Sequence, residues 1–432
     1  MTTPTRLLPY VAVCAVIVPL AAHATAPLPA AASPTDVEER LEELERKANE
    51  APVAPPVSAP IANIADSGTH VADKSKVTLG GYVEGYFAHN FNSPDNGLTN
   101  YRGFDNRHQQ LTLQNVVLDT VGALGAVTTH VAVQFGHTAE AYYAAEPRNA
   151  GAAGAGGSGP NVWKFLQQAN VTWLAPVGRG LTLDAGLFLS PIGAEGMAVK
   201  DQWNWSRSNL FFGLPFYHSG LRATYPLGTH STVSLQLYNG WNSATDNNAS
   251  LSVAGQYTYT LPDTLTINAL YFGGVERDRL APEGQPWRHL GDVYAAVYPR
   301  PWLSLLVHVD AGAESTAFGR SGWAAAAGYV RVQARNWLYF AGRADYFREW
   351  IASDASGKAA PLFWAGAEFV GSQTLTIDTR PTDNLSVRLE YRRDRAQAPL
   401  FFRGPVALDA AGAFVANTVE QHTLLLGATS WF

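Results

Sequence analysis

The chain has 432 residues and a formal net charge of −6; only 15% of its residues are charged, while 47% are hydrophobic. Soluble proteins carry roughly 25% charged residues, whereas low charge together with 39 glycines, 12 tryptophans and 18 tyrosines is typical of a membrane β-barrel. The negative charge argues against nucleic acid as a partner. Beyond the N-terminus, the sequence has no run of about 18 apolar residues, which excludes a bundle of transmembrane helices.

Residues 1–26 are predicted to be a secretory signal peptide. Arg6 gives a positively charged start, residues 7–20 are apolar, and a small-x-small cleavage pattern follows. The apolar stretch is too short for a membrane-spanning helix, although a retained anchor is the alternative. The only cysteine, Cys14, lies in this segment, so the mature chain would have no disulfide, thiolate metal site or cysteine nucleophile.

The next two segments are predicted to precede the barrel. Residues 36–50 are helical by propensity, and their apolar positions are spaced 4, 3 and 4 apart, as in a coiled-coil seam: Val37, Leu41, Leu44 and Ala48. We interpret this segment as a short periplasmic helix that assembles a trimer; the alternative is a frayed tail, because two heptads are marginal alone. Residues 51–76 form a Pro-rich, extended linker.

From residue 77 to residue 432, apolar and polar residues alternate with period two, which predicts an all-β, antiparallel transmembrane β-barrel. The stretches are long enough to cross a bilayer when tilted, and longer than typical strands of soluble sandwiches. We predict sixteen strands, at about 77–90, 108–121, 125–138, 162–175, 180–190, 216–226, 231–241, 249–261, 264–275, 290–299, 302–313, 322–334, 336–348, 370–380, 385–395 and 419–432.

The connections between these strands alternate between short and long. Outer-membrane barrels have short periplasmic turns and longer outer loops, so both chain ends are expected on the periplasmic side. The long connections are predicted at about 91–107, 139–161, 191–215, 242–248, 276–289, 314–321, 349–369 and 396–418.

Aromatic residues stand near the predicted strand ends, as in the girdles of membrane barrels. Those beside short turns are Trp173, Tyr225, Tyr298, Trp302, Trp337 and Trp431, and those beside long loops are Trp163, Trp241, Phe347 and Trp350. The chain ends in Phe432, and a terminal aromatic residue resembles the signal recognised by the barrel assembly machinery.

Several motifs resemble the OmpL-like outer-membrane β-barrel porin family of Gram-negative bacteria. They are LGGYVEGYF at 79–87, NYRGFDNRH at 100–108, LQNVVLD at 113–119, QFGHT at 134–138, PTDNL at 381–385 and RLEYR at 388–392. The resemblance covers most of 77–432 and implies a pore in the outer membrane. It implies no defined substrate and no functional residues.

Charged residues on the strands are expected to face the lumen, because a charge facing lipid at the midplane costs about 2–4 kcal/mol for Arg or Lys. In general porins of similar topology the third long loop folds inward, so we expect residues 191–215 to narrow the pore; the alternative is an external, solvated loop. Opposed charges across the constriction would orient polar solutes. The candidate residues are Glu195, Lys200, Asp201 and Arg207 on the loop, and Arg222, Arg343, Arg388 and Arg392 on the wall.

The specific hypothesis is that the carboxylates of Glu195 and Asp201 face the arginines of the wall across the pore. A second interpretation makes Trp203 and Trp205 a platform on which sugars stack.

The sequence therefore predicts an outer-membrane porin for passive diffusion of small hydrophilic solutes or ions. We expect a homotrimer that contacts membrane lipid and lipopolysaccharide, with its N-terminal segment in the periplasm. An outer-membrane lipase or protease and a surface adhesin are the alternatives. The sequence has neither a Gly-x-Ser-x-Gly elbow nor a His-Glu-x-x-His motif, and it suggests no catalytic residue, cofactor or metal site.

Overall fold

The computed structural model describes residues 72–148, 157–282 and 284–432. The predicted signal peptide, the helix over 36–50 and the linker up to residue 71 lie outside the described residues. The first strand begins at Ala72, inside the segment predicted to be linker.

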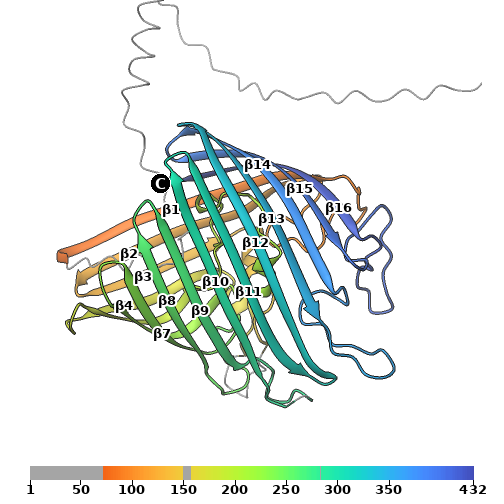
Figure 1. Ribbon diagram of the computed structural model, residues 1–432, viewed down its shortest axis with the longest axis horizontal. Helices are drawn as coiled ribbons and strands as arrows, with labels where there is room; N and C mark the ends of the chain where they lie inside the picture. Colours follow the sequence, from red (N-terminus) through yellow and green to blue (C-terminus); the bar gives the residue numbers. More distant parts are fainter. Residues whose placement is uncertain (1–71, 149–156, 283) are drawn as a thin grey trace, which may run out of the picture. The chain divides into compact units, whose positions relative to one another are not determined.

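The described residues form sixteen antiparallel strands, each paired with its chain neighbours, and β1 pairs with β16 to close the barrel (Figure 1). The strands are β1 (Ala72–Asn90), β2 (Leu111–Gly125), β3 (Val127–Phe135), β4 (Leu166–Ala175), β5 (Leu181–Leu189), β6 (Tyr217–Pro226), β7 (Ser231–Tyr238), β8 (Ser252–Leu261), β9 (Leu265–Val275), β10 (Trp287–Arg300), β11 (Leu303–Thr316), β12 (Gly319–Arg335), β13 (Leu338–Trp350), β14 (Phe369–Thr382), β15 (Leu385–Ala396) and β16 (Glu420–Trp431).

Short helices lie only in the connections between these strands, within the part of the chain that the structure describes. They are α2 (His137–Tyr142), α3 (Pro160–Trp163), and the 3-10 helices η1 (Val199–Asp201) and η2 (Leu210–Gly213). None of the described helices has the length and apolar character needed to cross a membrane. The predicted strand number, order and antiparallel pairing are confirmed.

The prediction of a long loop over 314–321 is wrong. Strands β11 and β12 continue until Thr316 pairs with Gly319, so the turn between them is tight. Glu314, the first residue of the predicted loop, instead points into the lumen, where it is buried and forms ion pairs with Arg277 and Arg288. A lumen-facing strand is polar on its inner face, so polarity alone does not distinguish it from a loop.

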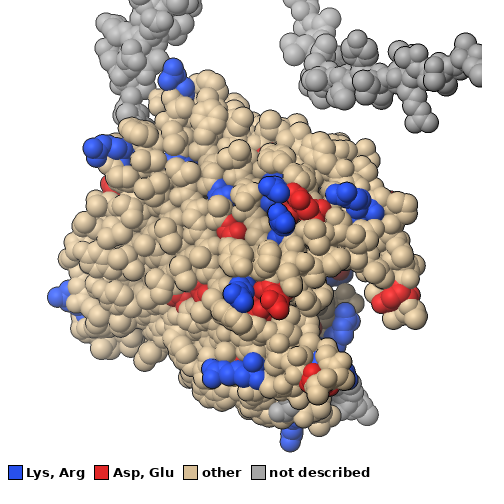
Figure 2. Space-filling view, turned by 45° about the vertical axis from the view of Figure 1, so that its right-hand side comes forward, with Lys and Arg blue, Asp and Glu red and all other residues tan. Residues whose placement is uncertain are grey.

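The two faces of the barrel wall differ as the alternation predicts. Outward side chains are apolar and exposed, such as Leu235 and Leu375, whereas inward ones are buried and polar, such as Glu84, Arg343 and Arg388. Most of the surface seen in Figure 2 carries no charged side chain, and the charged groups gather mainly on the right-hand side. This distribution leaves the outer wall suited to lipid and the inner wall to charge.

The aromatic girdle is confirmed in part. Trp302, Trp337 and Trp350 are about half exposed on the outer surface. Phe347, however, is fully buried and faces the lumen, and Trp241 packs inside the barrel against Phe272 and Trp323, so their placement in the girdle is wrong. Phe347 stands an even number of residues from Arg343 and Asp345 on the same strand, β13. Alternate residues of a strand share a face, so Phe347 points into the lumen as they do.

Candidate functional site

The connection between β5 and β6, residues 190–216, enters the barrel and is called the third loop below. Nearly all its residues are buried. The sheet allows a close approach just before the loop, where Gly186 pairs with Gly220. Gly186 has φ 138°, and a Cβ there would come within 2.2 Å of the Ala169 carbonyl oxygen, so only glycine fits. The prediction that this loop folds into the barrel is confirmed, and the alternative of an external, solvated loop is wrong.

Two wall carboxylates accept hydrogen bonds from the backbone of the third loop. Glu84 on β1 accepts from the N–H of Val199 at 2.5 Å. Glu390 on β15 accepts from the N–H groups of Trp205 and Ser206, at 2.5 and 2.9 Å. Since a buried backbone N–H without a partner is costly, these carboxylates hold the loop in the lumen.

Wall arginines satisfy the carbonyl groups of the same loop. Arg343 on β13 and Arg392 on β15 both donate to the carbonyl oxygen of Arg207, from 3.2 Å in the case of Arg343. Arg388, also on β15, donates to the carbonyl oxygen of Asn204 at 3.1 Å. The three predicted wall arginines therefore do surround the loop, but they bind much of it through its backbone.

The predicted pairing of loop carboxylates with these arginines occurs at Glu195. Its carboxylate forms an ion pair with Arg343 at 2.9 Å and accepts from the N–H of Ser208 at 2.8 Å. Asp201 instead pairs with its neighbour Lys200 at 2.9 Å, and both are part-exposed. The structure thus brings Glu195, but not Asp201, into contact with the arginine wall.

Arg207, the fourth candidate on the loop, closes the loop on itself. It donates to the carbonyl oxygens of Gly196 at 2.8 Å and Met197 at 2.6 Å. Its guanidinium group also lies over the ring of Phe104, 5.7 Å from the ring centre. Because Arg207 is buried and has these partners, it stabilises the folded conformation of the loop.

Arg222 on β6 lies away from the arginine wall. It forms an ion pair with Asp184 on β5 at 2.9 Å, and its guanidinium group lies over the ring of Phe188. The structure therefore does not bring this predicted residue together with Arg343, Arg388 and Arg392.

The two loop tryptophans pack into the wall. Trp205 donates from its indole N–H to Gln114 at 2.9 Å, and its ring occupies the space above Gly427, where a Cβ would lie 2.5 Å away. Trp203 makes an edge contact with Tyr329. Both rings are at most 5% exposed, so packing, rather than a sugar platform, explains them. A glycine at an inward position of β16 was the sequence signal for this contact.

The end of the barrel that carries the long loops is narrowed by further buried contacts. In the first loop, residues 91–110, Arg102 forms ion pairs with Asp105 at 2.6 Å and with Asp394 of β15 at 3.2 Å. Burial alone would raise the pKa of Asp105, but the Arg102 guanidinium holds it below its ordinary value. Trp364, from the connection 351–368, is fully buried among aromatic rings. Folded loops therefore cover the lumen at the end that carries the long connections.

Residues 76–424 match a family model described as "Putative beta-barrel porin-2, OmpL-like". The chain belongs to this family. The resemblance found in the sequence motifs is thereby confirmed, and this OmpL-like chain is an outer-membrane β-barrel of the porin type. A comparison with curated protein sequences finds no match.

Solved porin structures share the fold of this OmpL-like barrel at low sequence identity. The outer membrane channel DcaP of Acinetobacter baumannii is 10% identical, with a TM-score of 0.53 over 84% of this chain and 99% of that one. An anion-selective porin from Comamonas acidovorans is 11% identical, with a TM-score of 0.52 over 83% and 100%. The trimer form of OmpT of Vibrio cholerae is 9% identical, with a TM-score of 0.50 over 83% and 100%.

Replacing Glu390 by Ala should loosen the third loop of the OmpL-like barrel without unfolding the strands. Charge-assisted hydrogen bonds contribute about 1.5–3 kcal/mol each, so losing two should speed amide exchange around Trp205 and Ser206 by about a hundredfold or more. Hydrogen–deuterium exchange with mass spectrometry measures this. Glu420→Ala, at the part-exposed rim of β16, is the control and should leave exchange in the third loop unchanged; equal exchange in the two variants would contradict the assignment.

Proposed function

We propose that this barrel is a porin through which small hydrophilic solutes and ions diffuse passively across the outer membrane, with the third loop as its constriction. The observation that carries the proposal is a closed sixteen-strand barrel whose inner face is charged. Barrels of about sixteen strands leave an aqueous channel, whereas barrels of eight are filled by side chains.

The charges around the third loop support a narrow, polar channel. Negatively charged side chains bind the N–H groups of the loop, and positively charged ones bind its carbonyl groups. The former are Glu84 and Glu390, and the latter are Arg343, Arg388 and Arg392. Because these groups are already paired with the loop, the field along the channel comes from fixed, compensated charges. Such a lining favours small polar solutes over apolar ones.

An enzymatic function has one structural observation in its favour, a buried Ser–His pair. Ser190 Oγ lies 3.1 Å from Nε2 of His218, whose Nδ1 lies 3.0 Å from the carbonyl oxygen of Gly240. Both side chains are at most 3% exposed, and the imidazole stacks on Tyr238. This packing supports a structural hydrogen bond at the base of the third loop, so we favour the porin.

Single-channel recordings test the porin proposal. The full chain should give stable openings in planar bilayers, and replacing residues 194–208 by a short Gly-Ser linker should raise the conductance several-fold, because the constriction is removed. Liposome swelling should show that larger sugars then pass.

Ser190→Ala is the control for this experiment, because it changes the buried pair without removing the loop; it should conduct like the wild type. Absence of openings in both the wild type and the shortened variant would contradict the proposal. So would ester or peptide hydrolysis that the wild type performs and Ser190→Ala loses.

We also propose a homotrimer, assembled through the outer face of β4–β8. These strands have 8–10 residues each, against 12–17 in β10–β16. Their outward side chains, Leu221, Leu235 and Leu237 among them, line an apolar hollow of about 680 Å³. The fold shared with the OmpT trimer form supports a second copy of this chain as the occupant.

Native mass spectrometry in detergent should count three copies of the full chain. Ala223→Trp fills the hollow on β6 with an apolar ring and should shift the population to monomers. Ala344→Trp, at an outward position of β13, is the matched control and should remain trimeric. A monomeric wild type, or equal behaviour of the two variants, would rule out this interface.

We propose the remaining partners and the orientation of the chain from the two ends of the barrel. Phe432 is 67% exposed beside the start of the barrel and pairs with Gly81 through its backbone, which supports the C-terminal aromatic as the contact with the assembly machinery. The short turns lie at this end, which supports a periplasmic N-terminal segment, with the long loops toward lipopolysaccharide. Photo-cross-linking from residue 432 in cells would show whether the assembly machinery is bound.

A further inference from the structure

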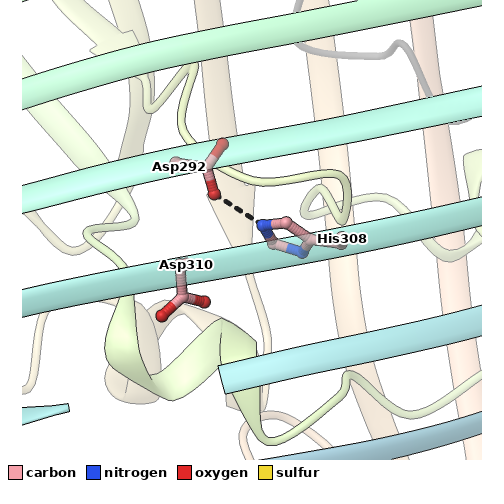
Figure 3. A group of neighbouring side chains, drawn as sticks. All are labelled: Asp292, His308 and Asp310. Atoms are coloured by element: carbon pink, nitrogen blue, oxygen red, sulfur yellow. Dashed lines mark hydrogen bonds and ion pairs between the residues drawn. The ribbon is translucent and has the colours of Figure 1, made fainter. Parts of the chain in front are cut away.

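Three ionisable side chains meet on the inner wall, away from the arginines (Figure 3). Asp292 is on β10, and His308 and Asp310 are on β11. Asp292 and Asp310 are direct cross-strand partners in the register of the two strands, and His308 precedes Asp310 by two residues on the same face. All three are at most 1% exposed.

The hydrogen bonds of this cluster leave two of its buried polar atoms without a partner. Asp292 accepts from Nε2 of His308 at 2.5 Å and from the N–H of Gly193 in the third loop at 3.2 Å. Asp310 accepts with one oxygen from the indole N–H of Trp323 at 3.1 Å. The other oxygen of Asp310 and Nδ1 of His308 are buried and have no hydrogen-bond partner.

The charges of the cluster are only partly compensated, because the pair of His308 with Asp292 leaves a second carboxylate, Asp310, without an ion-pair partner in the cluster. Like charges directly opposite each other on one face of a sheet are destabilising, and a buried charge without a partner is more so. Elsewhere on the inner wall, carboxylates such as Asp378 and Asp394 pair with arginines. Asp292 and Asp310 have no ion pair with Lys or Arg among the described residues, so a bound cation would supply the positive charge that the cluster lacks.

We propose that Asp292, His308 and Asp310 bind a divalent transition-metal cation of the zinc type. One imidazole nitrogen and two carboxylate oxygens are a ligand set that zinc accepts, with water in the remaining position. One ligand atom from each residue lies within 4.8 Å of the others. Tetrahedral zinc with bonds of about 2.1 Å separates two ligands by about 3.4 Å, so side-chain rotations that bring the ligand atoms closer by up to about 1.4 Å complete the site.

Neighbouring groups orient these ligands, as second partners do in metal sites. Trp323 fixes one oxygen of Asp310, and Gly193 fixes one oxygen of Asp292. Gly193 has φ 88°, and a Cβ there would lie 3.4 Å from Cε1 of His308, so the loop backbone closes directly over the imidazole. On binding, the cation takes the place of the proton between Asp292 and Nε2 of His308, and the imidazole binds as a neutral ligand with its remaining proton on Nδ1. The bound cation then ties the first turn of the third loop to the wall.

Titration of the barrel with zinc chloride tests the proposal. The full chain, untagged and stripped with a chelator, should bind one Zn²⁺ per chain in calorimetry. His308→Gln and Asp310→Asn should each weaken this binding at least tenfold. Asp184→Asn is the matched control, because it removes an inward carboxylate that already pairs with Arg222, and it should bind like the wild type.

Cobalt provides a readout that a purely structural ion pair would not give. Co²⁺ added to the wild type should produce visible absorption bands of a low-symmetry nitrogen–oxygen site, and both cluster variants should lose them. Heat-modifiable migration on gels verifies that each variant forms a barrel. Absence of stoichiometric Zn²⁺ binding and of cobalt bands in the folded wild type would overturn the proposal, as would binding that all three variants retain unchanged.

Discussion

Lipid excludes charge from the outer face of the barrel, and the rest of the structure depends on this constraint. Strand residues alternate between the two faces, so outward positions carry mostly apolar or small side chains, and most ionisable side chains of the strands lie in the lumen. The inner wall therefore carries carboxylates such as Glu84 and Glu390 beside arginines such as Arg343 and Arg388. Charges of both signs, held on rigid strands, are therefore available as partners for a loop that folds into the lumen.

The third loop occupies this charged interior. A loop that enters a barrel brings backbone N–H and carbonyl groups that lose water and need partners. Glu84 and Glu390 accept from its N–H groups, while Arg388 and Arg392 donate to its carbonyl oxygens. Because these are hydrogen bonds to charged groups, they are stronger than neutral ones. The same charges that lipid excludes from the outside thus position the constriction inside.

The sequence was sufficient for the barrel because period-two alternation and turn spacing are local properties. It predicted sixteen strands, the alternation of inner and outer faces and the inward third loop. It failed where the local pattern was ambiguous: the polar residues at the β11–β12 turn resembled a loop, and Phe347 was placed by its proximity to a strand end rather than by its phase.

The contacts of the candidate site were harder to predict, because many of them join a side chain to a backbone group. Nothing in the sequence specifies that Glu390 binds the N–H groups of Trp205 and Ser206. Likewise, Asp292 meets His308 and Asp310 only through the register of two strands. A search for spaced metal ligands along the chain does not detect such a cluster, although the spacing of His308 and Asp310 placed those two on one face.

The most direct test of the loop's position is cross-linking, since the only cysteine of the chain is Cys14 in the predicted signal peptide. Asn204 of the third loop donates to Thr376 of β14 at 2.7 Å. Cysteines at positions 204 and 376 should be joined in the folded barrel by a short bifunctional thiol reagent, and the cysteine at 204 should resist a bulky maleimide applied to intact cells. Rapid maleimide labelling at 204, with no link to 376, would contradict a third loop that lies inside the barrel.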